Sequence, residues 1–196
     1  MGTATDADLV RQTLCGASTA YDCLMKRYQR QVYNLAFRMI GNAEDAGDLV
    51  QETFLRAYSA LPSFRQDASF LTWLYKIASN LCIDHLRSRK TRSALSLDVE
   101  VEEGREPAAD SRSCGPEDCA VRGSIQEIVQ HEVLNLPEKY RLVVVMRHLQ
   151  DMSVEEIAQV LEIPTGTVKT HLFRGRDLLR SRLRPILGGD VDGQSI

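Results

Sequence analysis

The basic residues near the C-terminus have the clearest chemistry in this 196-residue chain. Between residues 164 and 187 a single acid, Asp177, stands against six basic residues: Lys169, Arg174, Arg176, Arg180, Arg182 and Arg184. A DNA duplex is a line of phosphate charge, and cations that neutralise phosphates gain affinity because counterions are released. This bias favours DNA binding over the alternative, a helical hairpin with a solvated basic face.

No comparable set of residues points to catalysis. Asp84 and His85 are adjacent, but no nucleophile accompanies them in a credible arrangement, and there is no phosphate-binding glycine loop. The five cysteines are irregularly spaced without a CxxC pair, and the four histidines do not cluster with them, which disfavours structural zinc. We therefore expect no enzymatic activity, no catalytic residue, no metal and no cofactor.

The cysteines fall into two groups. Cys23 and Cys82 lie in apolar helical patterns, so we expect both to be small core residues. Cys114 and Cys119 lie in a polar segment, where ordinary reduced thiols are the first expectation and a redox role stays open.

The basic residues lie in the second of two predicted helices. Ser153, followed three residues later by Glu156, has the capping-box pattern that begins a helix. Pro164 ends that helix because the residue before a proline is pushed out of the α region. A second helix then starts near Thr165. Two helices joined by a short turn form a helix-turn-helix, whose second helix enters the major groove.

An acidic segment separates this region from the rest of the chain. Between residues 98 and 118 eight acids stand against two arginines, a local charge of −6 in a chain of net charge −3. The segment contains glycine and proline and has no apolar periodicity, so it is typical of a flexible linker. We expect an all-α protein of two small helical domains: residues 1–95, an acidic linker 96–120, a second domain 121–187 and a flexible tail 188–196.

The N-terminal domain is expected to be helical throughout. Thr5 or Asp6 can cap a short first helix, and Ser18 can cap a long one that Gly41 ends. Asn42 can cap the next helix, and a further helix is predicted from residue 70 to about residue 90.

Two polar surfaces stand out on these helices. Asp45, Asp48, Gln51 and Glu52 share one face at spacings of three and four, and chemistry alone favours a merely solvated face. The helix over residues 70–90 ends in basic residues that either complement the helix dipole or hold a nucleic-acid strand beside the loop residues Phe64 and Arg65.

Three long stretches resemble the conserved regions of bacterial sigma-70 family factors. They are DLVQETFLRAYSALPSFR, ASFLTWLYKIASNLCIDHLRSRK and LPEKYRLVVVMRHLQDMSVEEIAQVLEIPTGTVKTHLFRGRDLL. The chain is similar more narrowly to the extracytoplasmic-function (ECF) group, which keeps only the second and fourth sigma domains. This resemblance implies a protein that binds core RNA polymerase and directs initiation at promoters.

The resemblance assigns roles to particular positions. Residues matching the face that docks on the β′ clamp helices are Asp45, Asp48, Gln51 and Glu52, which overturns the solvated-face interpretation. Residues matching the −10 region, where a flipped base is captured and a melted strand is held, are Ser63, Phe64, Arg65, Asn80, Asp84, Arg87, Arg89 and Lys90. Residues matching the helix that reads the −35 duplex are Thr167, Lys169, Thr170, His171, Phe173, Arg174 and Arg176.

The implied partners are core RNA polymerase (β′ clamp helices and β flap), promoter DNA and an anti-sigma factor. Homo-oligomers are not expected. Two other classes of protein are the alternatives: a stand-alone helix-turn-helix regulator, and a sigma mimic that titrates an anti-sigma factor. The chain has no spare dimerisation helix for the first class, and a mimic would not need a basic recognition helix.

The expected location of the protein depends on features that its sequence lacks. No apolar run is long enough to span a bilayer, and the first ten residues lack the regions of a signal peptide. We expect a cytoplasmic protein without stable membrane insertion, held near a membrane only through an anti-sigma factor.

Overall fold

The chain folds into helices throughout the part that the structure describes. The structure is a computed structural model that describes residues 4–65, 68–100 and 120–187, and within these ranges there is no β-strand. Most of the predicted acidic linker, together with Cys114 and Cys119, lies outside the described residues. The observed class agrees with the all-α prediction.

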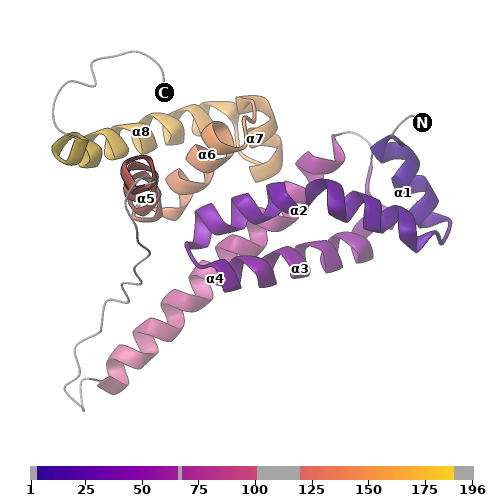
Figure 1. The fold of residues 1–196 in the computed structure, drawn as a ribbon, viewed down its shortest axis with the longest axis horizontal. Helices are drawn as coiled ribbons and strands as arrows, with labels where there is room; N and C mark the ends of the chain where they lie inside the picture. Colours follow the sequence, from indigo (N-terminus) through magenta and orange to yellow (C-terminus); the bar gives the residue numbers. More distant parts are fainter. Residues whose placement is uncertain (1–3, 66–67, 101–119, 188–196) are drawn as a thin grey trace.

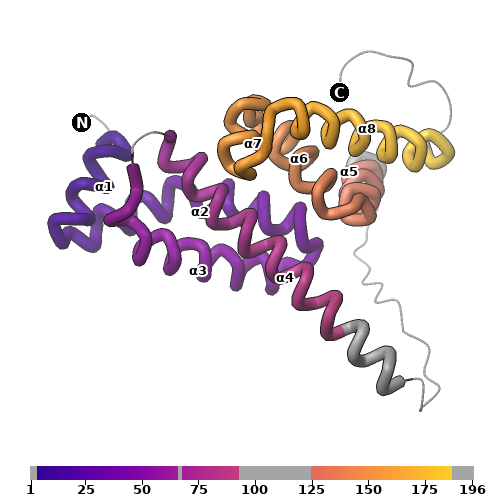
Figure 2. The backbone as a smooth tube through the Cα atoms, turned by 180° about the vertical axis from the view of Figure 1, so that it is seen from behind, coloured from indigo at the N-terminus to yellow at the C-terminus, as the bar shows by residue number. Residues whose placement is uncertain are grey.

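The helices form two groups that follow the chain order (Figure 1). The first group consists of α1 (Asp6–Leu14), α2 (Ser18–Ile40), α3 (Ala43–Ala60), the 3-10 turn η1 (Leu61–Ser63) and α4 (Phe70–Glu100). The second group consists of α5 (Ala120–Leu134), α6 (Glu138–Leu149), α7 (Val154–Leu161) and α8 (Thr165–Leu187). In the reverse view α4 runs diagonally past α2 and α3 (Figure 2).

The helix starts mostly match the capping signals in the sequence. The Thr5 side chain accepts a hydrogen bond from the Asp8 amide, and Asn42 accepts from the amides of Glu44 and Asp45. One cap prediction was wrong. Ser18 is the first residue of α2 rather than its cap, and no side chain satisfies the helix amides there. Gly41 ends α2 in the left-handed region, at a φ of 79°.

Helix α4 is longer than its sequence pattern predicts. Its apolar face ends near residue 86, and the predicted end was near residue 90, but the helix continues to Glu100. The extra turns contain no glycine or proline, so no strong helix breaker ends the helix before Glu100. The boundary predicted at residue 96 therefore falls inside a helix.

Each group has an apolar core. Leu24, Leu35, Phe54 and Leu74 are almost fully buried in the first group, where the Tyr21 hydroxyl donates to the Phe54 carbonyl oxygen at 2.5 Å. Cys82 is buried as expected, but Cys23 is exposed, so the prediction that it fills a core was wrong. The apolar pattern of α2 assigned Cys23 to the inner face, whereas the buried positions around it are Ala20, Tyr21 and Leu24.

Side chains from all four helices of the second group pack together in its core. Val143, Met146, Ile157 and Val168 are fully buried, so α6 and α7 provide the platform on which α8 lies. The two groups also contact each other, with α2 and α4 packing against α5, α6 and α7.

Candidate DNA and polymerase interfaces

Helix α8 presents one apolar face to the domain and a mainly polar face to solvent. Val168 and Leu172 are buried against α6 and α7, whereas Lys169, Thr170 and Phe173 are exposed. The spacing of three and four residues separates the two faces by the geometry of the helix. The capping box in which Ser153 and Glu156 bond reciprocally begins α7, and Glu162 in the left-handed region ends it before the turn that leads into α8.

Phe173 is the most exposed large apolar side chain identified in the described residues, at 73%. An isolated apolar group in contact with water needs no explanation by itself. Here it lies among cations on the outer face of a helix-turn-helix, where an apolar side chain can contact a thymine methyl group in the major groove.

Two arginines of α8 are held by neighbours on α6. Arg174 donates to the Tyr140 hydroxyl at 3.3 Å, and Arg176 donates from Nε to Nε2 of His148 at 3.1 Å. Burial lowers the pKa of His148, and the nearby Arg176 and Arg147 lower it further, so the ring is kept neutral and able to accept this bond. Both guanidinium groups are thus partly preorganised on the exposed side of the helix.

Two of the predicted −35 residues are less accessible. Thr167 is half-buried, and His171 is half-buried with its ring edge against Tyr140, at 5.4 Å between ring centroids. Burial and the charges of Lys139 and Arg174 lower the pKa of His171. The other five predicted residues of this site are exposed.

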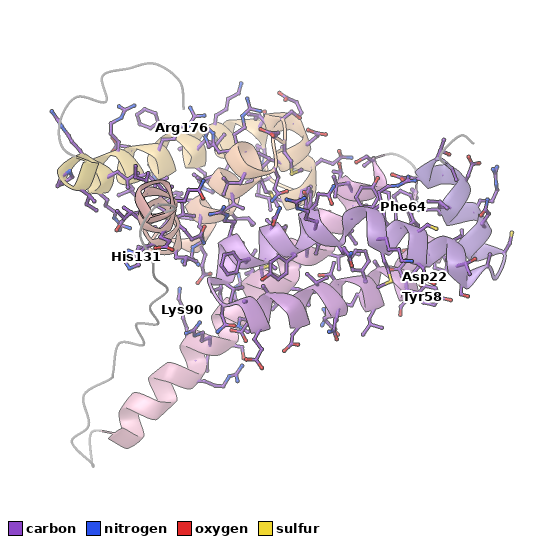
Figure 3. The ribbon with its side chains drawn as sticks, viewed as in Figure 1. Asp22, Tyr58, Phe64, Lys90, His131 and Arg176 are labelled. Carbon is purple, nitrogen blue, oxygen red and sulfur yellow. The ribbon has the colours of Figure 1, made fainter. Side chains whose placement is uncertain are left out.

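The loop before α4 carries an aromatic cluster. Phe64 is half-buried, with its ring centroid 5.0 Å from that of Trp73 and 5.7 Å from that of Phe70. Ser63 and Arg65 are exposed beside it, and the Ser63 hydroxyl donates to the Ala60 carbonyl. The cluster anchors the loop at the N-terminus of α4, and Figure 3 shows Phe64 near that end of the helix.

The remaining predicted −10 residues follow along α4. Asn80, Asp84, Arg87 and Arg89 are all exposed. Lys90 is exposed as well, but its ammonium group pairs with Glu138 of α6, in the other domain. Helix α4 therefore carries an uncharged amide near its middle and cations towards its C-terminal part, an arrangement suited to a base contact followed by backbone contacts.

The acidic strip lies on α3. Asp48 and Gln51 are exposed, and Asp45 and Glu52 are half-exposed. Glu52 pairs with Arg56 at 2.7 Å one turn later, while Asp45 lies 3.5 Å from Nε2 of His85 on α4.

Two apolar residues beside this strip were missed by the sequence reasoning. Leu55 is 65% exposed and Tyr58 is 52% exposed, and a shallow hollow next to them is lined by Glu52, Leu55 and Arg56. The available signal was their spacing, with Leu55 four residues after Gln51 and Tyr58 three residues after Leu55. Exposed apolar groups rimmed by charges mark protein-binding surfaces.

Two further findings concern other classes of site. Within the described ranges no group of His, Cys, Asp or Glu side chains is arranged to hold a metal ion. Among the helices in those same ranges, none is long and apolar enough to cross a bilayer.

Comparison with known protein families matches both helical groups. The family described as "Sigma-70 region 2" matches residues 24–92, and "Sigma-70, region 4" matches residues 126–179. The ECF RNA polymerase sigma factor SigW of Bacillus subtilis is 38% identical over 179 residues, which is 90% of this chain and 96% of that one. The RNA polymerase sigma-H factor of Pseudomonas aeruginosa is 36% identical over 93% of this chain and 95% of its own.

Solved structures show the same architecture. CnrH, solved in complex with the cytosolic domain of CnrY, is 26% identical with a TM-score of 0.65 and covers 91% of this chain and 96% of its own. The sigma factor RpoE of Bartonella quintana, solved with the anti-sigma factor NepR, shares the fold at 18% identity and a TM-score of 0.61, over 83% of this chain and 96% of its own.

The two helical groups are thus the second and fourth regions of a sigma factor. The chain belongs to the sigma-70 family of RNA polymerase sigma factors, within its ECF group. Sigma factors are promoter-recognition subunits of RNA polymerase and are not enzymes. The region 2 match covers most of α2, all of α3 and most of α4, and the region 4 match covers α6 and α7 with most of α5 and α8.

Proposed function

We propose that three surfaces of this chain divide the work of promoter-specific initiation. The acidic strip of α3 docks on the β′ clamp helices of core polymerase, α4 and its preceding loop hold the melted −10 strand, and α8 reads the −35 duplex. The observation that supports this division best is the outer face of α8, where the exposed Phe173 lies among cations on a helix whose other face is buried.

At the −35 element, base reading and backbone positioning fall to different side chains. Phe173 and Thr170 offer apolar contacts for thymine methyl groups, and Lys169 and Arg174 can pair with guanine edges. Arg176 is held by His148 through Nε. It is best suited to a phosphate contact, because its two other guanidinium nitrogens can still donate to phosphate oxygens. Thr167 contributes to −35 binding by placing the start of α8. His171 contributes by packing its ring edge against Tyr140.

At the −10 element, the aromatic cluster around Phe64 provides a firm base for the loop that captures an unstacked base. Ser63 and Arg65 present polar groups at its rim, and Asn80 and Asp84 follow on α4 as candidates for base contacts. Arg87, Arg89 and Lys90 then hold the strand backbone, which gives affinity without sequence information.

Polymerase docking combines charge with apolar contact. Asp45, Asp48, Gln51 and Glu52 supply the charged and polar part of the surface, and Leu55 extends it with an exposed apolar group. Region 4 would contact the β flap at the same time. Two tethered DNA contacts reinforce each other through effective concentration once the polymerase sets their spacing.

An anti-sigma factor is the proposed negative partner. This proposal is supported by the Bartonella sigma factor, which was solved with one. CnrH was solved with the cytosolic domain of its partner, which supports a cytoplasmic site of action with any membrane association arising through such a partner. We further infer that the chain acts as a single copy in the polymerase complex.

Run-off transcription from a promoter library with purified bacterial core polymerase tests these roles. The wild-type protein should select a set of promoters. Asp48→Arg should reduce initiation at least tenfold at every promoter, because it reverses one charge of the docking strip. Asp22→Arg is the matched control, since it makes the same charge change on an exposed face of α2 outside the strip, and it should initiate normally.

The same assay separates promoter reading from docking. Phe173→Ala should reduce discrimination at the −35 element several-fold while leaving polymerase binding intact, because it removes the proposed apolar contact with a thymine methyl group. Specific promoter binding by the protein alone, without polymerase-dependent initiation, would instead indicate a free-standing regulator. Normal initiation by Asp48→Arg would overturn the proposed docking surface.

A further inference from the structure

Helix α6 packs against α8 beside the residues proposed to read the −35 duplex (Figure 1). A Cβ atom built at Gly175 would lie 3.5 Å from Cβ and 3.6 Å from the carbonyl oxygen of Tyr140, so the two backbones approach closely at this point. Tyr140 belongs to the first turn of α6 and is buried. The close packing therefore fixes Tyr140 beside Arg174, the residue that precedes Gly175.

The ring of Tyr140 is held by two further neighbours. Its centroid lies 5.4 Å from that of His171, with the two rings edge to face, and the Lys139 ammonium group lies 5.0 Å from the same centroid. Edge-to-face ring pairs and cations over an aromatic ring are both favourable arrangements. The hydroxyl group at the far end of the Tyr140 ring therefore has a well-defined position.

This hydroxyl group meets the guanidinium group of Arg174. It accepts a hydrogen bond from Nη1 of Arg174 at 3.3 Å, and this bond raises the pKa of Arg174 and lowers the pKa of Tyr140. Arg174 is itself exposed, and an exposed side chain that is already restrained loses less conformational entropy when it binds. With Nη1 engaged, Nη2 and Nε form the edge of the guanidinium group that is left for DNA.

Arg174 and Arg176 lie on different sides of α8. At about 100° per residue, Arg174 is turned by about 40° from Thr170, and Arg176 by about 120° in the opposite sense. Phe173 also lies within about 60° of Thr170. Arg174 thus shares the exposed face of Thr170 and Phe173, whereas Arg176 lies on the flank beside His148.

The orientation of a guanidinium group decides whether it can read a base. Arginine recognises guanine through two parallel hydrogen bonds to O6 and N7. Both bonds form only when the planar fork faces the edge of the base, because its donors have a fixed geometry. A tyrosine hydroxyl that holds one nitrogen restricts this orientation before DNA is bound.

We propose that Tyr140 is a positioning residue for promoter reading, which holds Arg174 in the orientation that selects a guanine in the −35 duplex. This inference rests on the proposed function of α8. Tyr140 needs no contact with a base, since it acts through Arg174. Because Tyr140 lies on α6, outside the helix-turn-helix of α7 and α8, the proposal makes α6 a determinant of −35 specificity.

Run-off transcription with core polymerase tests this role on a library in which each −35 base pair is varied in turn. Arg174→Ala should abolish the base preference at one position and so identify the base pair that Arg174 reads. Tyr140→Phe should lower the preference at that same position by about threefold to tenfold, the effect of losing one hydrogen bond, and leave the other positions unchanged. Phenylalanine keeps the buried ring, so an unchanged urea midpoint is expected for region 4.

The double variant separates positioning from a direct contact of Tyr140 with DNA. When Arg174→Ala is already present, Tyr140→Phe should not lower initiation at the preferred promoter any further, because the two residues act as a unit. A full additional loss in the double variant would overturn the proposal. An equal loss from Tyr140→Phe at every promoter sequence would also overturn it, and would show that the hydroxyl group holds the DNA backbone instead.

Tyr33→Phe is the matched control. It removes the same atom from a half-buried tyrosine of α2, whose ring stacks on Phe37, and should leave every −35 preference unchanged. A wild-type protein without any −35 preference would refute the proposed function of α8. A wild-type preference that neither Arg174→Ala nor Tyr140→Phe alters would refute the positioning role alone.

Discussion

Gly175 lies where α8 crosses α6, and the lack of a side chain there lets the two helices approach. A Cβ atom at this position would lie 2.7 Å from Cγ2 of Val144, which is buried and β-branched and cannot easily move. Glycine normally weakens a helix interior by up to about 1 kcal/mol relative to alanine. At this position close packing decides the residue type and outweighs helix propensity.

Gly175→Ala should therefore destabilise region 4 by about 1–3 kcal/mol despite its better propensity, because overpacking costs that much. Gly166→Ala is the matched control in the same helix, since nothing lies within 4 Å of its added Cβ, and it should be neutral or stabilising. Urea unfolding of the two variants checks this. A stabilised Gly175→Ala would show that α6 and α8 can move apart without cost.

His148 makes the stability of region 4 depend on pH. Burial and two nearby arginines lower its pKa, so below about pH 6.5 the unfolded chain binds more protons than the folded one. This stability is fully present above pH 6.5 and is lost as the pH falls from there through the lowered pKa of the folded state. Protonation also removes the acceptor that holds Arg176.

The urea midpoint of the wild-type protein should accordingly fall between pH 7.5 and pH 5.5, and His148→Gln should lose less over the same interval. Glutamine can still accept from Arg176 but does not titrate. His171 is present in both proteins and contributes equally to each. Identical pH dependence in the two proteins would rule out His148 as a source.

At the scale of elements, α7 depends on its capping box. The Ser153 hydroxyl accepts from the Glu156 amide at 3.1 Å, and the Glu156 carboxylate accepts from the Ser153 amide and hydroxyl at 2.8 Å. These bonds lower the pKa of Glu156. A helix of eight residues has little stability of its own, so its first turn matters for the placement of α8.

Ser153→Ala should cost about 1 kcal/mol of region 4 stability, as loss of a cap usually does. Ser181→Ala in α8 is a suitable control, because that exposed hydroxyl only donates to the Leu178 carbonyl within its own helix. Thermal denaturation of both variants measures the difference. Equal small effects would mean that packing alone holds the start of α7.

At the scale of the whole molecule, Arg141 links the stability of the two regions. Arg141→Met should destabilise the protein by about 2–4 kcal/mol, since it leaves three carbonyls without their donor. The effect should reach region 2, where faster amide hydrogen exchange is expected in the last turn of α2. Arg147→Met is the control, because Arg147 donates to the Met152 carbonyl inside region 4. Exchange changes confined to region 4 after Arg141→Met would disprove the linkage.

The sequence by itself determined the helical class, most of the helix ends and the exposed faces of α3 and α8. These depend on interactions within about four residues, such as the caps at Asn42 and Ser153 and the apolar spacing of Val168 and Leu172, and such interactions are legible in a linear pattern. The charge of the recognition helix is likewise a local property. The exposure of Leu55 depends on no long-range contact. It was nevertheless not predicted, because an apolar residue in a helix is normally expected in the core.

Only the tertiary structure decided which groups meet across the chain. Gln130 binds Arg38 and Arg141 binds Met39 from about one hundred positions away, and no periodicity encodes such pairings. The partners of Arg174 and Arg176 on α6, the exposure of Cys23 and the space required by Gly41 and Gly175 depend in the same way on where helices cross. Those crossings are set by the packing of whole apolar faces, which the sequence specifies only collectively.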